Sequence, residues 1–186
     1  MTSLQKNSNV NYKTIVIDFP WNVKNNFDPK KVGYGRKMPY ELMSNDEIMN
    51  FDINHFTQGD CDLFMWVTHT TLPLGLKILE QWGFNYHALI TWDKTRGVTM
   101  LGLHRNSEMC LYAYRGHMGL KQKGKSINTV FRETRKRHSE KPQTFYSMIL
   151  PNTKEPRIDI FARKKHIGFD AYGNEVDNTL TLEHYA

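Results

Sequence analysis

The sequence predicts an α/β domain with a mostly parallel central sheet and helices on both of its faces. Short apolar runs alternate along the chain with segments that have helix start and stop signals. The run Cys61–Val67 is apolar almost without interruption, which is typical of a strand buried on both faces. Strands that alternate with helices form parallel sheets, and ligands of such sheets bind outside the carboxyl ends of the strands.

Local signals give the order and approximate bounds of the elements. Ser44 and Glu47 have the spacing of a capping box, which opens a helix. Gly83 suits a helix end, because glycine adopts the positive φ of a C-terminal cap at little cost. Helices are expected over about 44–54, 71–82 and 142–150, strands over about 13–18, 61–67, 84–92, 107–114, 127–131 and 156–162, and a polar loop over about 94–106.

Length and composition bound the function further. The 186 residues suit one domain, which we place at 12–186 after a flexible arm at 1–11. The net charge of +6 favours an anionic cofactor or a polyanion such as nucleic acid as the partner. Cys61 and Cys110 both lie in apolar runs, and no run approaches the ~20 residues that span a membrane. We therefore expect a cytoplasmic protein without disulfides.

The segment Asp18-Phe19-Pro20-Trp21 follows the first predicted strand and suggests a site for a flat base. A carboxylate can accept a hydrogen bond from an exocyclic amine, and the proline turn can direct a backbone carbonyl the same way. The indole can stack on a base that has been flipped out of a nucleic-acid duplex. The alternative is an ordinary strand end with a surface aspartate.

Two later segments suggest a cofactor. Ser139 and Lys141 precede a helix, and a cation beside a positive helix end is unfavourable unless an anion also lies there. A ligand carboxylate would supply that anion. After the last strand, Arg163 is followed by Asn174 and Glu175, whose amide and carboxylate can hold the two hydroxyls of a ribose. The alternatives are a solvated lysine and a polar C-terminal turn.

A dense basic run in the second half of the chain is a candidate for phosphate contacts. A solvated charged surface is the alternative. The histidines and cysteines have no metal-ligand spacing, so no metal site is expected. The nucleic-acid-binding candidates are Lys121, Lys123, Lys125, Arg132, Arg135 and Arg137.

Taken together, these segments resemble one family. It comprises the adenine-N6 methyltransferases related to the 70-kDa catalytic subunit of the eukaryotic mRNA N6-adenosine methyltransferase, and especially its small bacterial and phage members. The resemblance covers about residues 12–176. The matching segments are Asp18–Trp21, Pro39–Ser44, Leu63–Thr68, Ile90–Lys94, Ser139–Pro142, Phe161–Arg163 and Gly173–Glu175.

The resemblance implies a Rossmann-like methyltransferase fold in a permuted motif order, with the catalytic tetrapeptide early and the cofactor strand late. The cofactor would be S-adenosylmethionine. By family, Lys141 would meet the cofactor carboxylate, and Arg163, Asn174 and Glu175 would surround its ribose. Ser139 and Phe161 belong to the same cofactor segments.

The resemblance also implies catalytic roles. Asp18 would lie between the methionine amino group and the target N6, and Pro20 would offer its carbonyl to the same amine. Trp21 would stack on the base, and Tyr40 would line the adenine pocket. The chain departs from the family pattern at Phe19, where the signature has a first proline, and after Arg163, where it lacks a His-Asn pair.

Several questions stay open at this point. Site choice is expected from the loops 22–38, 94–106 and 115–138, or from a partner. The small size favours DNA over RNA as substrate. The alternatives are an RNA adenosine-N6 methyltransferase, an inactive partner subunit, and a glutamine or small-amine methyltransferase, whose signature would be Asn-Pro-Pro-Tyr. The oligomeric state is also open, and both a homo-oligomer and a hetero-oligomer are possible.

Overall fold

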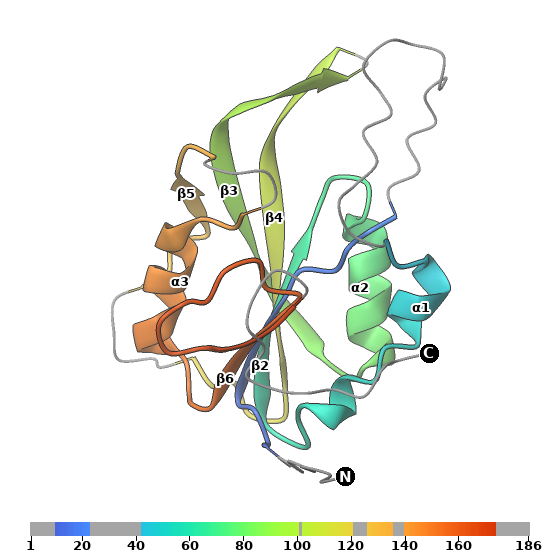
Figure 1. Cartoon of the computed structure of the whole chain (residues 1–186), viewed down its shortest axis with the longest axis vertical. Helices are drawn as coiled ribbons and strands as arrows, with labels where there is room; N and C mark the ends of the chain where they lie inside the picture. The colour runs from blue at the N-terminus through green and yellow to red at the C-terminus, as the bar shows by residue number, and fades with distance from the viewer. Residues whose placement is uncertain (1–9, 23–41, 101, 121–125, 136–139, 174–186) are drawn as a thin grey trace, which may run out of the picture.

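The computed structural model describes residues 10–22, 42–100, 102–120, 126–135 and 140–173 (Figure 1). Within these residues seven strands form one sheet in the order β5-β3-β4-β2-β1-β6-β7. The strands are β1 (Thr14–Ile17), β2 (Cys61–Val67), β3 (Asn85–Met100), β4 (Leu103–Arg115), β5 (Val130–Arg132), β6 (Arg157–Ile160) and β7 (Asp170–Tyr172).

The sheet is mostly parallel, as the sequence predicted. β1 pairs in parallel with β2 and β6, β6 with β7, and β3 with β5. Only β4 runs antiparallel to both of its neighbours, β2 and β3. The carboxyl ends of the six other strands therefore lie at one edge of the sheet, and β4 begins at that same edge.

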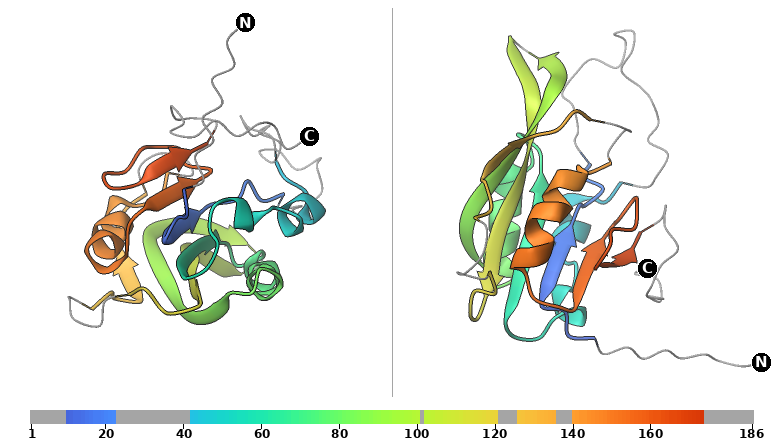
Figure 2. Two further views of the ribbon diagram at one scale, coloured as in Figure 1. Left: turned by 90° about the horizontal axis from the view of Figure 1, so that it is seen from below. Right: turned by 90° about the vertical axis from the view of Figure 1, so that its left-hand side faces the viewer.

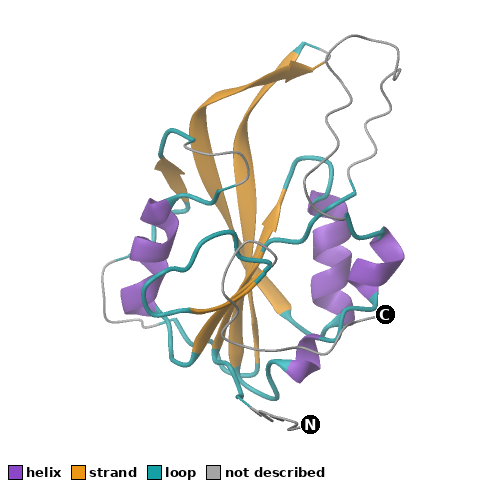
Figure 3. Cartoon of the chain, in the orientation of Figure 1, coloured by secondary structure: helices purple, strands orange, loops and turns teal. Residues whose placement is uncertain are grey.

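The helices cover both faces of the sheet (Figures 2 and 3). They are α1 (Asn45–Met49), α2 (Leu72–Gln81) and α3 (Gln143–Ile149), with short 3₁₀ turns at Ile53–His55 and Leu150–Asn152. Alternate residues of β1 point to opposite faces: Ile15 and Ile17 join the core under α1 and α2, and Val16 joins the core under α3. None of the helices in the described ranges is long and apolar enough to cross a membrane.

The structure confirms the helix caps that the sequence predicted. The Ser44 hydroxyl accepts a hydrogen bond from the Glu47 N–H at 3.2 Å, and the Glu47 carboxylate accepts one from the Ser44 N–H at 2.6 Å. Gly83 has φ +71° just beyond the end of α2, which confirms it as the stop of that helix. The first helix ends at Met49 rather than near residue 54, because the chain there turns into the 3₁₀ segment.

The expected loop at 94–106 is wrong. β3 continues to Met100 and β4 begins at Leu103, so this segment is an antiparallel hairpin. Val98 pairs with Arg105 and Thr99 with His104. The sequence of this segment is as polar as that of a loop, because the hairpin extends beyond the core and its strands need no apolar face there. β7 was also missed, since three residues give too short a pattern to detect.

Candidate active site

Asp18 directly follows β1 at the carboxyl edge of the sheet. Its N–H donates to the carbonyl of Ile160, the last residue of the neighbouring strand β6, at 3.2 Å. Its side chain is 16% exposed, so the carboxylate is largely removed from water without being sealed off. The ends of two adjacent parallel strands thus hold this carboxylate, as expected for a ligand site of an open α/β sheet.

Phe19 turns away from Asp18 into the core. It is 3% exposed, and its ring centroid lies 5.4 Å from that of Trp21 and 5.5 Å from that of Phe51. The residue that replaces the family proline is therefore a core residue. Its burial anchors the turn from below, while Pro20 still restricts the backbone of the turn.

Lys141 lies between two carboxylates. Its Nζ is 3.1 Å from Asp18 Oδ2 and 3.0 Å from Glu108 Oε2. Lys94 Nζ lies 3.1 Å from the other oxygen of Glu108. The ammonium of Lys141 also lies 5.0 Å from the centre of the Trp66 ring, a favourable cation–π distance. Alternating charges thus connect β1, β4, β3 and the segment before α3.

These contacts set the protonation of the cluster. Burial disfavours every charge here, and it raises the pKa of Asp18 despite the opposing field of Lys141. For Glu108 the two lysines outweigh burial and lower the pKa to about 2. For Lys141 the fields of Asp18 and Glu108 outweigh burial and raise the pKa. Glu108 and Lys141 therefore form an ion pair, whereas burial opposes the charge of Asp18.

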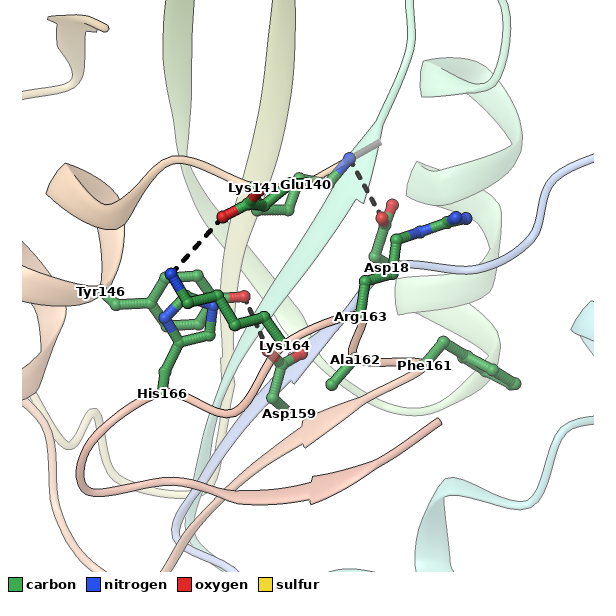
Figure 4. A pocket seen from close by; sticks show the side chains of 10 residues that line it. All are labelled: Asp18, Glu140, Lys141, Tyr146, Asp159, Phe161, Ala162, Arg163, Lys164 and His166. Atoms are coloured by element: carbon green, nitrogen blue, oxygen red, sulfur yellow. Dashed lines mark hydrogen bonds and ion pairs between the residues drawn. The ribbon is translucent and has the colours of Figure 1, made fainter. Parts of the chain in front are cut away.

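A pocket opens beside this cluster (Figure 4). It lies at the carboxyl ends of β1 and β6, next to the start of α3. Figure 4 shows Lys141 and Asp18 joined across its upper side and Tyr146 and Asp159 deeper within. It is lined by Asp18, Glu140, Lys141, Tyr146, Asp159, Phe161, Ala162, Arg163, Lys164 and His166.

The deep part of the pocket holds a second acid. Tyr146 donates to Asp159 Oδ2 at 2.7 Å, and burial raises the pKa of Asp159 to about 8. The Tyr146 ring stacks on His166, with centroids 3.4 Å apart and an interplanar angle of 9°. Burial, with help from Lys164, lowers the pKa of His166 to about 4. Burial thus favours the neutral forms of both the imidazole and the carboxyl group on this wall.

Sequence reasoning did not single out Glu108 or Asp159. Both acids lie inside predicted strands, and a single charged residue in an apolar run was the only feature of the sequence that could have indicated them. Glu108 is 33 residues from Lys141, and only the register of β4 brings the two together. Asp159 is the one acid of β6 and is 3% exposed.

The other two residues of the tetrapeptide have structural contacts of their own. The Pro20 carbonyl accepts a hydrogen bond from the Met43 N–H at 3.0 Å, which leaves one lone pair for another donor. Trp21 is 8% exposed, and its Nε1–H donates to the Trp66 carbonyl at 3.1 Å. The indole therefore belongs mainly to the core, and its stacking on a base stays a prediction.

Phe161 and Arg163 both line the pocket. Phe161 has φ +63°, a left-handed conformation that is strained for a residue with a side chain, and its ring lies 5.4 Å from that of Phe19. This strained turn brings Ala162 and Arg163 to the mouth of the pocket. Strain of this kind is frequent where a fold must present a ligand site.

Of the remaining candidates, two lie within the described residues and the others lie outside them. Arg132 pairs with Asp93 at 2.8 Å and is 74% exposed, and Arg135 is exposed. Among the residues that the structure covers, no group of three His, Cys, Asp or Glu side chains could hold a metal ion. The candidates that lie outside the described residues are Tyr40, Ser139, Asn174, Glu175, Lys121, Lys123, Lys125 and Arg137.

Comparison with known proteins adds the deciding observation. The MT-A70 family model matches residues 12–175, nearly the whole chain. The chain belongs to the MT-A70 family. This confirms the resemblance found in the sequence and the Rossmann-like methyltransferase fold that it implies. It also confirms the expected enzyme class and methyl donor at the level of the family, whose members are adenine-N6 methyltransferases that use S-adenosylmethionine.

The relatives differ in how much longer they are than this chain. The type II methyltransferase M.MunI of a Mycoplasma species is 26% identical, and the match covers 92% of this chain and 81% of that protein. The catalytic subunit of the N(6)-adenosine-methyltransferase of Homo sapiens is 26% identical, with 92% and 29% covered. The MT-A70-like N(6)-adenosine-methyltransferase of Arabidopsis thaliana is 27% identical, with 92% and 24% covered. The chain therefore spans less than a third of these two eukaryotic relatives.

The pocket suits the methyl donor of the MT-A70 family. A methionine-type ligand needs a cation for its carboxylate and an anion for its ammonium, and Lys141 and Asp18 offer these groups 3.1 Å apart. Two of the three ammonium protons of Lys141 face Asp18 and Glu108, which leaves one for a ligand. Arg163 and the ring of Phe161 lie on the neighbouring wall, beside β6.

Proposed function

We propose that this protein transfers a methyl group from S-adenosylmethionine to the N6 amine of adenine in DNA. The observation that carries the proposal is the position of the Asp18 carboxylate. It lies at the mouth of a pocket between two strand ends and is held by Lys141 at 3.1 Å. A largely desolvated carboxylate at such an edge can accept a hydrogen bond from an exocyclic amine and fix its direction.

The chain's own residues would bind the methyl donor from two sides. The third N–H of Lys141 would donate to the carboxylate, and Asp18 would accept from the ammonium group. Arg163 would contact the nucleoside end, together with Asn174 and Glu175, as the family resemblance implies. When bound, S-adenosylmethionine supplies an electrophilic methyl group on a sulfonium that leaves readily.

Orientation of the acceptor is the main task of the protein. The lone pair of N6 is delocalised into the purine ring, so hydrogen bonds from its protons to Asp18 and to the Pro20 carbonyl would localise and aim it. Alignment of this kind can account for much of the rate. N6 becomes acidic only after it has gained the methyl group. Asp18, whose pKa burial raises, can then hold the released proton.

The similarity to the Mycoplasma type II methyltransferase supports DNA as the polymer. The match covers 81% of the Mycoplasma type II methyltransferase but only 24% and 29% of the two eukaryotic N(6)-adenosine-methyltransferases. The basic candidates Arg132 and Arg135 are exposed on and beside β5 and suit phosphate contacts. A cytoplasmic location, which the two buried free cysteines favour, belongs to the same proposal.

The test is a tritium-transfer assay with labelled S-adenosylmethionine. Duplex DNA, single-stranded DNA and RNA of the same sequence serve as substrates, and nucleoside analysis identifies the product. We expect N6-methyladenine, with the highest rate on DNA. Label on cytosine or on protein, label on RNA alone, or no transfer by folded protein that binds the methyl donor would contradict the proposal.

A further inference from the structure

The hairpin of β3 and β4 extends well beyond the rest of the sheet. β2 ends at Val67, which pairs with Met109, and β5 pairs with β3 only as far as Asp93. From Val98 to Arg105, within the described part of the chain, the two strands pair only with each other. Figures 1 and 2 show this two-stranded ribbon rising from the edge of the sheet at which Asp18 lies.

A distortion at the base of the ribbon sets its direction. The register of β3 against β4 shifts between Asp93 and Val98, and Thr95 there has φ +61°. Gly97 passes so close to β4 that a Cβ atom would lie 2.3 Å from the Arg105 carbonyl oxygen. Irregularities of this kind bend and twist a strand pair. In Figure 1 the tip of the ribbon leans toward the α2 side of the molecule.

The base of the ribbon is tied to the active-site charges. Lys94 pairs with Glu108 at 3.1 Å, and Glu108 pairs with Lys141 at 3.0 Å. On the other side the Asp93 carboxylate accepts a hydrogen bond from Arg132 at 2.8 Å. The base of the ribbon therefore belongs to the same chain of ion pairs that holds Asp18.

The ribbon is positively charged and has no acidic side chain. Residues 94–106 contain one lysine and two arginines but neither aspartate nor glutamate. Arg96 and His104 are exposed and Arg105 is half-buried. Beyond the base, Arg132 on β5, which pairs with Asp93, and Arg135 are also exposed. Such an arrangement is complementary to a polyanion.

The shape of the ribbon selects among polyanions. The major groove of B-form DNA is wide enough for a two-stranded β-ribbon, whereas the major groove of an A-form RNA duplex is deep and narrow. We propose that the ribbon 94–106 enters the major groove of duplex DNA beside the target adenine, with Arg96 and Arg105 contacting its phosphates or base edges. The inference rests on the proposed function for its substrate class, but DNA binding is measured without methyl transfer.

Binding by fluorescence anisotropy tests the proposal. The probes are a labelled DNA duplex, an RNA duplex of the same sequence and single-stranded DNA. The double variant Arg96→Ala/Arg105→Ala is compared with Lys77→Ala/Lys154→Ala, which removes the same charge from exposed positions outside the ribbon. We expect the ribbon variant to bind duplex DNA about tenfold or more weakly with a shallower salt dependence, and the control to bind nearly as wild type.

A second measurement keeps the proposal testable if the double variant does not fold. Both native cysteines are buried, so Leu103→Cys, at a side chain that is 67% exposed, carries a single photo-cross-linker at the ribbon tip. We expect cross-links to the bases of duplex DNA.

Three results would overturn the proposal: equal binding by the two double variants, wild-type binding to RNA duplex as tight as to DNA duplex, or cross-links only to a second copy of the protein. Duplex binding that depends on the ribbon, but without methyl transfer, would instead contradict the proposed function alone.

Discussion

At the scale of single residues, Glu108 deserves as much weight as the tetrapeptide that the sequence makes conspicuous. It neutralises Lys141 from the side opposite Asp18 and is itself held by Lys94. Without it, Lys141 would have one carboxylate partner and a freer choice of position. Glu108 therefore positions Lys141, and through Lys141 it fixes the Asp18 carboxylate.

Glu108 should also make stability depend on acid. Its pKa falls from the ordinary 4.5 to about 2 in the folded protein, so it stabilises the fold fully above about pH 4.5. That contribution is lost as the pH falls toward 2, and it amounts to about 3 kcal/mol at most. We expect urea unfolding of Glu108→Gln to show a shallower loss of stability between about pH 5 and 2. An identical acid profile in variant and wild type would contradict the ion pair.

At the scale of elements, helix caps and apolar strands were predicted reliably, and the exposed part of the hairpin was not. The capping box, the stop at Gly83 and the buried strand β2 were all predicted from neighbouring residues. The hairpin was missed because strand propensity reports burial on a pleated surface, and the ribbon is not buried. Beyond Asp93, β3 is held by backbone pairing with β4, and this pairing requires no apolar pattern in the sequence.

Gly97 gives a test of the ribbon as an element. A methyl group at this position would meet backbone atoms of Arg105, which cannot move without opening the pair. We expect Gly97→Ala to make local opening of the ribbon easier by about 2 kcal/mol, seen as faster amide hydrogen exchange over 94–106. Leu103→Ala, at an exposed position of the same ribbon, is the control. Unchanged exchange in Gly97→Ala would mean that the strands do not approach as described.

At the scale of the whole molecule, the sheet brings together residues that the sequence scatters. Asp18, Lys141, Phe161 and Arg163 were all predicted from sequence, and the structure places all four on one pocket. The sequence could not show that Asp159 also lines this pocket or that Glu108 contacts Lys141, because contacts between strands depend on register. The same architecture places the ribbon and the pocket at one edge of the sheet.

The most direct test of the account is the rate at which Asp18→Asn forms N6-methyladenine in DNA, measured by mass spectrometry of the nucleosides. The amide keeps the size of the side chain but removes the charge that accepts from N6. Asp46→Asn, at an exposed position of α1, is the matched control. We expect Asp18→Asn to fold, to bind DNA like the wild type and to lose at least about 99% of the activity. A folded Asp18→Asn protein that methylates adenine at the wild-type rate would contradict the central role of this carboxylate.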